Sequence, residues 1–527
     1  MDCAIKMMIY MYAELNYKKT LILSLCFIKC VVLGAAAQQL PTLESQGQGA
    51  WRTTEGVAHL TLDDAIFTAQ NQSIAAMTAK YTFLSSYWSY RSHKASLLPS
   101  LNLTGNLLSF DRSLSLLQDY DTGDLRYFEN YNMQNQIGLS LRQNIALTGG
   151  TLSVYSSLNR LDQFGSIDRK SYYSQPITLS YTQPLFAYNS LKWAKKIEPK
   201  EYELAKRHYI EAMEDVTARA VSYFFSLALS EANHRKAQKN YENTKSLYAI
   251  AEQRLKIGTI SKDELLQLEL RMLNDSLSIN NTALSLREQQ MRLTSFLRLK
   301  ENTTVEPIIN EEIPVIALDY EMVLSKALSN SSFELENEIS LLNAEASIAQ
   351  AKANRGASAS FNARFGLSQT ASELGAAYVN LLDQEVVGLQ FSLPIFDWGM
   401  GKGRVKMAKA RAEMTRSQIE QAEIDYRHEV YTLLEQFTNQ RNQCEVSRRA
   451  QAIALDRYAI AMDNFRRGTL SVTEMNTAQS EKDSAEQTYI SSLATFWNYY
   501  YQLRRLTLYD FMTKTDIEAE FEKIIKE

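Results

Sequence analysis

Two long tracts of the chain are nearly free of residues that break helices. From 166 to 355 the only glycine is Gly258, and from 404 to 527 the only glycine is Gly468. No proline occurs from 200 to 306. A proline costs about 3 kcal/mol and a glycine about 1 kcal/mol inside a helix. The tracts therefore predict long helices that reverse at the two glycines.

The apolar positions inside these tracts agree with helices that pack on other helices. Apolar and small residues step by three and four, as in Tyr241, Thr244, Tyr248 and Ala251. Such a narrow seam is typical of coiled coils. The predicted helices cover about 63–96, 191–257, 262–300, 319–355, 402–467 and 471–510. At 1.5 Å per residue, each of the two longest spans roughly 100 Å.

Two other segments, 99–186 and 357–396, alternate apolar residues with small or polar ones. Examples are "FNARFGLS" and "VGLQFSL". This alternation predicts strands with one apolar face. In an exported protein such a face can contact lipid while the polar face lines a lumen.

The chain is a tandem repeat. "LSYTQPLF" at 179–186 matches "LQFSLPIF" at 389–396, and "GTISKDEL" from Gly258 matches "GTLSVTEM" from Gly468. Both matches have an offset of 210 residues. Several matches in the same order indicate duplication. We assign 38–318 to the first repeat, 319–510 to the second and 511–527 to a C-terminal tail.

The first repeat is longer than the second in its strand region. "DAIFTAQNQS" and "MVLSKALSNS" are 258 residues apart, which exceeds the later offset of 210 by 48. The 48-residue insert contains a strand-like pair, "NQIGLSLRQNI" and "TLSVYSSL". The insert adds strands to the main sheet or forms an extracellular extension, and the sequence does not choose between them.

The N-terminus has the pattern of an export signal. Lys18 and Lys19 precede the apolar run "LILSLCFIKCVVLG" and then "AAAQQ". We expect a signal peptide over 1–37, cleaved after Ala37. The only later cysteine is Cys444, which excludes an intramolecular disulfide. No later apolar stretch approaches the length of a transmembrane helix, so a membrane location would require a closed β-barrel.

Charge and side-chain chemistry narrow the function further. The net charge of -4 argues against a nucleic-acid partner, which would favour a basic surplus. The five histidines show no metal-ligand spacing, and no nucleophile–base motif is visible. The sequence thus predicts no enzyme, no cofactor and no metal site.

Over 62–510 the chain resembles the TolC-like outer-membrane efflux family. The resemblance rests on "LLPSLNLTG", "QPLF", "LPIFDWG" and the two helix turns, "RLKIGTISKDELLQLE" and "NFRRGTLSVTEMNTAQ". It implies mixed α and transmembrane β structure in a homotrimer. Tandem-duplicated helical hairpins would form a periplasmic tunnel. Each protomer typically gives four strands to one shared 12-stranded β-barrel, and the insert could make this barrel larger.

The same resemblance implies a location and partners. The protein would lie in outer-membrane lipid with a periplasmic extension. It would passively conduct substrates in a tripartite efflux or type I secretion system. Its partners would be a periplasmic adaptor (a membrane fusion protein) and an inner-membrane RND or ABC transporter. The residues alone also allow a periplasmic coiled-coil adaptor or scaffold, although that class should have one hairpin and a lipoyl-like domain.

The resemblance places candidate functional sites at the helix tips. Gly258, Thr259, Gly468 and Thr469 would dock the adaptor; the alternative is an ordinary helical turn. Glu264 and Glu474 each follow a tip glycine by six positions. They would line the pore entrance, where three protomers would contribute six carboxylates that favour cations. The alternative for these glutamates is a solvated helix face.

Overall fold

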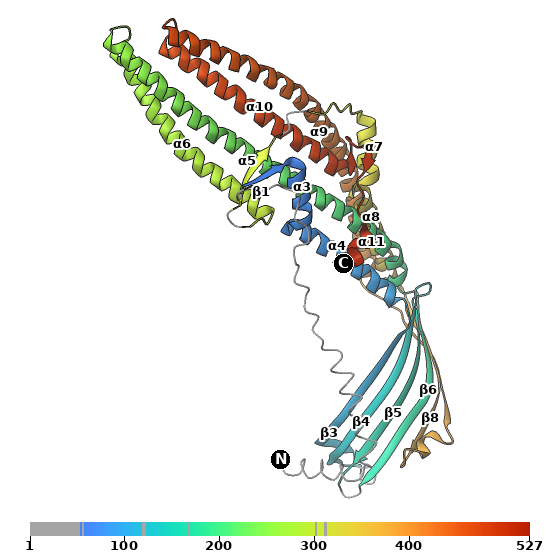
Figure 1. Cartoon of the computed structure of the whole chain (residues 1–527). Coiled ribbons are helices and arrows are strands. Elements are labelled where there is room, and N and C mark those ends of the chain that lie inside the picture. Colours follow the sequence, from blue (N-terminus) through green and yellow to red (C-terminus); the bar gives the residue numbers. More distant parts are fainter. Residues whose placement is uncertain are drawn as a thin grey trace, which may run out of the picture. The chain divides into compact units, whose positions relative to one another are not determined.

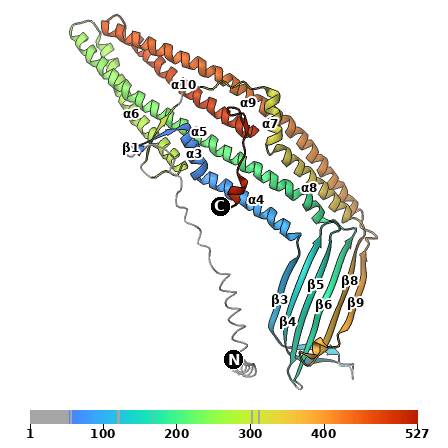
Figure 2. The ribbon, with the colours of Figure 1, turned by 45° about the vertical axis from the view of Figure 1, so that its right-hand side comes forward.

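The structure is a computed structural model, and it describes residues 53–54, 57–118, 123–165, 168–300, 303–309 and 313–526. Long helices continue into one large antiparallel sheet, as Figures 1 and 2 show for the described part of the chain. The expected signal peptide, 1–37, lies outside the described residues. Within the described residues no helix is long and apolar enough to cross a membrane.

Four long helices form two hairpins, as the glycine distribution predicted. The first hairpin reverses at Gly258 and the second at Gly468, and in both the reversal joins a helix of nearly seventy residues to a shorter one. These helices are α5 (Ser190–Lys256), α6 (Lys262–Phe296), α9 (Met400–Arg467) and α10 (Val472–Thr507). Their bounds agree with the prediction to within a few residues.

The two remaining predicted helices are each broken into two. The breaks follow α3 (Leu62–Gln72) and α7 (Tyr320–Asn330), and the second pieces are α4 (Ile74–Ser96) and α8 (Phe333–Ala353). Buried Ser73 has extended backbone angles, and its hydroxyl accepts a hydrogen bond from the Ala76 N–H. A serine in this position caps a new helix and ends the previous one. At the second break Ser331 is likewise extended, and Ser332 begins the next helix without a side-chain capping bond. The prediction of one continuous helix over 63–96 and over 319–355 was therefore wrong.

The large sheet has six strands, in the order β3-β4-β5-β6-β8-β9. The insert of the first repeat supplies part of β4 and much of β5, so it adds strands to this sheet. The family's typical four strands per protomer therefore do not hold for this chain, because the insert pairs within the sheet. The strands are β3 (Ser100–Gln118), β4 (Leu125–Ile145), β5 (Gly150–Gln163), β6 (Arg169–Leu185), β8 (Ser358–Ala371) and β9 (Leu382–Ser392).

The strand register separates an apolar face from a polar face. One row of paired residues reads Leu101, Leu141, Val154, Leu179 and Phe365. The rows beside it alternate, since successive side chains of a strand point to opposite faces. The polar face carries Asn102, Thr104, Gln136, Ser140, Ser157, Thr182, Ser360, Asn362, Gln384 and Gln390. The predicted alternation is confirmed.

A β-bulge in β3 keeps the apolar face continuous. The pairing with β4 shifts between Asn106 and Ser109, so Leu107 and Leu108 together oppose one residue. Leu108 has a φ of 60°, and its N–H donates to the Asn135 side chain at 2.7 Å. The extra residue returns the leucines beyond the bulge to the apolar face.

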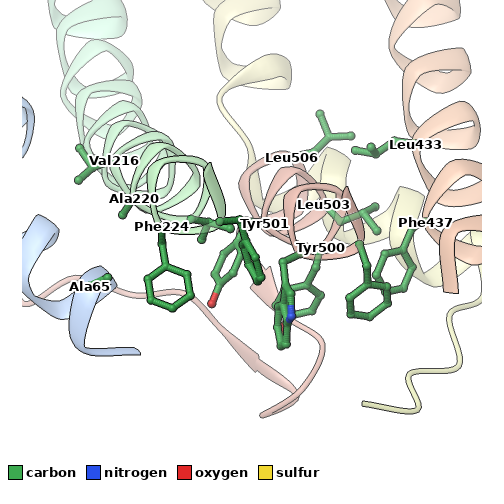
Figure 3. Packing of buried hydrophobic residues seen from close by; sticks show 14 of the residues in the cluster. Ala65, Val216, Ala220, Phe224, Leu433, Phe437, Tyr500, Tyr501, Leu503 and Leu506 are labelled. Atoms are coloured by element: carbon green, nitrogen blue, oxygen red, sulfur yellow. The ribbon is translucent and has the colours of Figure 1, made fainter. Parts of the chain in front are cut away.

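The helices pack together in an apolar core near the middle of the long helices. Phe224 of α5, Phe437 of α9 and Tyr500 of α10 are buried there, together with residues of α3 (Figure 3). A small sheet of β1 (Thr53–Thr54), β2 (Val57–Thr61) and β7 (Thr304–Ile308) packs beside it. The remaining elements are η1 (Ala376–Tyr378), β10 (Tyr509–Asp510), β11 (Thr515–Asp516) and α11 (Phe521–Lys526).

Candidate channel entrance at the hairpin tips

The two hairpin tips have the same backbone geometry. Gly258 has a φ of +74° and Gly468 a φ of +83°, which is the left-handed region that favours glycine. Nothing lies near the position of an added Cβ at Gly258, so the backbone angle and not crowding requires glycine there. Both glycines are exposed at the ends of the hairpins, where the sequence placed them.

The threonine after each glycine closes the turn. The N–H of Thr259 donates to the Arg254 carbonyl at 2.9 Å, and the N–H of Thr469 donates to the Asn464 carbonyl at 3.0 Å. Each threonine hydroxyl donates to that same carbonyl. These bonds satisfy a carbonyl at the end of the preceding helix. Thr259 and Thr469 thus have a structural role that leaves their surfaces exposed.

Glu264 and Glu474 begin the returning helices as members of capping boxes. One carboxylate oxygen of Glu264 accepts from the Ser261 N–H at 2.8 Å, and Glu474 accepts from the Ser471 N–H at 3.0 Å. The serine hydroxyls in turn accept from the glutamate N–H groups. The hydrogen bond from the Ser471 N–H holds the pKa of Glu474 below its ordinary value.

This capping role was missed, although the sequence contains its signal. "SKDE" from Ser261 and "SVTE" from Ser471 both match the capping-box pattern of serine with glutamate three positions later. Within one chain, hydrogen bonding lowers the Glu474 pKa; the carboxylate repulsion expected at a shared entrance would need other protomers. The pore-lining role of the two glutamates stays a prediction.

Behind the tips the two hairpins share one apolar cluster. Phe465 of α9 and Leu247 of α5 are both almost completely buried, and Met475 of α10 and Leu268 of α6 join them. All four long helices therefore contribute to one small core. This core joins the hairpins side by side close to their tips.

Polar contacts also join the hairpins, beside this core and farther from the tips. Asn240 of α5 donates to the Asp483 carboxylate of α10 at 2.5 Å. Asn243 of α5 donates to the Tyr458 hydroxyl of α9 at 3.0 Å. Arg271 of α6 donates to the Asn476 side chain of α10. The sequence did not predict these contacts, because the partners are more than 200 residues apart.

The Asp483 contact includes a buried charge pair. The Lys482 ammonium lies 3.2 Å from the Asp483 carboxylate, and the two side chains are 7% and 16% exposed. The same ammonium lies 4.7 Å from the centre of the Tyr458 ring on α9. One lysine thus interacts with both helices of the second hairpin, and its carboxylate partner binds the first hairpin.

The helix packing leaves α6 and α9 at the two outer edges. α5 packs on α6, on α10 and on the shorter helices, while α9 packs on α10 (Figure 1). Exposed leucines on α6 step by four, three, four and seven residues: Leu266, Leu270, Leu273, Leu277 and Leu284. Exposed residues on α9 step by seven: Val446, Ile453 and Ile460. Both edges carry apolar stripes at coiled-coil spacing.

No group of three histidine, cysteine, aspartate or glutamate side chains that could hold a metal ion occurs in the described ranges. Cys444 is a free, buried thiol, and burial raises its pKa to about 11. A thiol with so high a pKa is a poor nucleophile.

Comparisons with known proteins identify a family and a fold. The sequence model of the family described as outer membrane efflux protein matches residues 149–297 and 324–507. A search of curated protein sequences gave no significant match. The similar solved structures described next have low sequence identity, so they show the fold alone.

Three outer-membrane proteins illustrate the structural similarity. CmeC of Campylobacter jejuni, an outer membrane channel, has a TM-score of 0.62 and 15% identity, over 92% of this chain and 93% of CmeC. VceC of Vibrio cholerae has a TM-score of 0.58 and 13% identity, over 87% and 97%. The open state of MtrE of Neisseria gonorrhoeae, also an outer membrane channel, has a TM-score of 0.56 and 14% identity, over 87% and 91%.

Proposed function

Because this chain belongs to the outer membrane efflux protein family, it is an outer-membrane channel component of an efflux system, and we propose that it is a passive outlet. A periplasmic adaptor and an inner-membrane RND or ABC transporter complete the assembly, and the transporter supplies the energy. A type I secretion system would use the same outlet. The substrate then moves through the helical tunnel and leaves through the sheet region.

The observation that carries this proposal is that both layers of the protomer are open at their edges. In the sheet, β3 and β9 are the two edge strands. Five successive antiparallel pairings separate them, so they run in opposite directions. An edge strand in lipid would leave backbone groups without hydrogen-bond partners. Pairing β9 of one copy with β3 of the next removes every such edge.

The helical layer supports the same assembly. Leu266 follows Gly258 by eight positions, and Ile460 precedes Gly468 by eight. Leu273 and Ile453 lie fifteen positions from the same glycines. The stripes of α6 and α9 therefore lie at matching heights, and α9 of one copy can cover α6 of the next. Rotational repetition in a homotrimer closes the sheet and the helices together.

The two faces of the sheet fit this placement. The apolar face, with Leu101, Leu141 and Phe365 in one row, would contact outer-membrane lipid. The polar face would line the lumen, as in other barrels of the outer membrane.

The features of the hairpin tips fit a role as the end of the protein that binds the adaptor. Gly258, Thr259, Gly468 and Thr469 are exposed and form two nearly identical loops. The polar contacts between the hairpins, such as the one from Asn240 to Asp483, would hold the entrance closed at rest. Glu264 and Glu474 would then surround this entrance and favour cations.

Two measurements test the proposal. Native mass spectrometry of the detergent-extracted protein should give three chains, and a stable monomer or dimer would refute it. A photocrosslinker at Thr259 or Thr469 should capture the adaptor, whereas one at Ser113 on β3 should not. Capture from the strand position alone would contradict docking at the tips.

The alternative of a periplasmic adaptor or scaffold is not favoured by any observation. The chain has two helical hairpins instead of one, and its strands form one six-stranded sheet with an apolar face. Membrane fractionation separates the two, because an adaptor would not resist extraction from the outer membrane as a trimer.

A further inference from the structure

The sheet is larger than the family resemblance implies. Each protomer contributes six strands in place of four, so a trimer closes with three times six, or eighteen, strands. This step rests on the proposed trimeric channel. Barrel diameter grows roughly linearly with strand number, so eighteen strands give a barrel about 1.5 times as wide as twelve. At about 4.8 Å between strands and a tilt near 40°, the backbones would be roughly 36 Å apart.

The polar face of this sheet carries two arginines in one row. Arg142 of β4 pairs with Ser153, which pairs with Ser180, and Ser180 pairs with Arg364 of β8. Side chains in one such row point to the same face, so both guanidinium groups lie on the polar face. Both residues are exposed in the protomer.

The surroundings of the two arginines offer them no neutralising acid. The row ends in Ser100 on β3 and Val386 on β9. The next rows along the same face contain Asn, Ser, Thr, Gln, Gly and Tyr residues. Across the described ranges neither Arg142 nor Arg364 forms an ion pair; Arg364 lies over the Tyr155 ring at 5.9 Å.

The acids of the sheet lie elsewhere. Asp383 and Glu385 of β9 pair with Leu367 and Phe365, so they lie in rows of the apolar face. Asp111 is on the polar face but lies beyond the bulge of β3, away from the row of Arg142. The lumen at the level of the two arginines is therefore positively charged.

We propose that the outlet is an 18-stranded barrel whose lumen favours anionic solutes, through Arg142 and Arg364 of each protomer. Six guanidinium groups face one aqueous space, and rings of arginine select anions in other pores. Arginine remains charged at every physiological pH. The selected class is thus anionic solutes, which pass through a lumen wider than that of a twelve-stranded outlet.

The charge effect has a predictable salt dependence. The Debye length is about 30 Å at 10 mM salt and about 3 Å at 1 M. At low salt it is comparable with the barrel width, so the whole lumen experiences the arginine potential. A potential of about one kT raises the anion concentration in the lumen about e-fold and lowers the cation concentration about e-fold. The ratio of the two concentrations then changes about sevenfold. At 1 M salt the preference should nearly vanish.

Electron cryomicroscopy of the extracted trimer tests the barrel itself. Eighteen strands are expected, with β3 of one protomer beside β9 of the next. A trimer whose barrel contains twelve strands would overturn this inference and leave the proposed channel function intact. A protein that forms neither a trimer nor a pore would overturn both.

Reversal potentials in planar bilayers with a KCl gradient near 10 mM test the selectivity. The Arg142→Gln, Arg364→Gln double variant should lower the chloride-to-potassium permeability ratio at least about threefold relative to the original chain. The Arg112→Gln variant is the matched control, because Arg112 lies on the apolar face, where it forms an ion pair with Glu129 of the neighbouring row. It should leave the ratio unchanged.

A probe added only on the barrel side distinguishes an effect of the barrel lumen from an effect of the hairpin tips. Dextran sulfate should block the original channel more strongly than neutral dextran of equal size, and the double variant should lose this difference. An unchanged permeability ratio in a variant that still forms trimers and pores would overturn the arginine role. Equal block by both polymers in the original channel would overturn it as well.

Discussion

The contact between Asp483 and the first hairpin predicts how the entrance is held closed. Asp483 accepts from Asn240 of the other hairpin and also neutralises Lys482, whose side chain is only 7% exposed. The Asp483→Ala substitution removes both interactions and leaves a buried ammonium without its partner. Separation of the hairpins would return that ammonium to water. The substitution should therefore favour the open arrangement.

The magnitude follows from the burial of the pair. Removal of one partner from a buried ion pair costs about 3–5 kcal/mol. The Asp483 side chain is 16% exposed, so the low end, about 3 kcal/mol, applies. Since every 1.4 kcal/mol is a factor of ten, the open fraction should rise up to about 100-fold. Single-channel recording in planar bilayers measures this fraction directly.

Two further variants make the measurement decisive. Asp463→Ala on α9 removes an exposed carboxylate paired with Arg467, which should cost at most about 1 kcal/mol. Adding Lys482→Met to Asp483→Ala removes the unpaired charge and should recover part of the closed population. If Asp483→Ala behaves like Asp463→Ala, the contact does not hold the entrance closed and the reasoning fails.

Three other predictions concern the protomer edges, the tips and the core. Leu273→Asp places a charge in the apolar stripe of α6 and should prevent trimer formation, seen as monomers in native mass spectra; trimers of normal yield would argue against this edge. Ser471→Ala removes the cap that pairs with Glu474 and should destabilise α10 locally by about 0.5–2 kcal/mol, measured as faster amide hydrogen exchange at the tip; unchanged exchange would show that the cap is not needed. Burial raises the pKa of Glu214 despite the nearby Arg504. The contribution of Glu214 to the free energy of unfolding is therefore present below the ordinary carboxyl pKa and is lost as pH rises through the raised pKa. Glu214→Gln should therefore flatten the pH dependence of thermal unfolding above the ordinary carboxyl pKa, and an unaltered profile would contradict the assignment.

The helical half of the fold was largely predictable from the sequence. Long tracts with a single glycine predicted α5, α6, α9 and α10 closely, because helix-breaking residues act locally. The breaks at Ser73 and between Asn330 and Phe333 were missed. A serine inside a helical pattern is common, so it gives little sequence signal of a break. Only burial and neighbouring helices decide that such a serine interrupts a helix.

The sheet and the site were less predictable, because their essential features are relations between distant residues. Alternation identified the strands, but it could not show whether the insert pairs within the sheet. The bulge at Leu107 and Leu108 also changes the phase of the alternation in β3. At the tips, the turns at Gly258 and Gly468 were predicted correctly, while the docking and pore-lining roles stay predictions. The contact from Asn240 to Asp483 was not predicted, because it joins residues 243 positions apart on two hairpins.

The bulge in β3 has a consequence for how this strand tolerates variation. Up to Asn106 the lipid-facing positions have odd numbers, and from Phe110 onward they have even numbers. A cysteine-labelling scan along β3 should therefore invert its accessibility pattern at the bulge. Deletion of Leu108 would remove the extra residue and give a regular strand, in which Phe110 still faces lipid and Asp111 still faces the lumen. A single-residue deletion farther along β3, such as that of Ser113, would instead turn Leu114 and Leu116 toward the lumen and should impair barrel assembly more than deletion at the bulge.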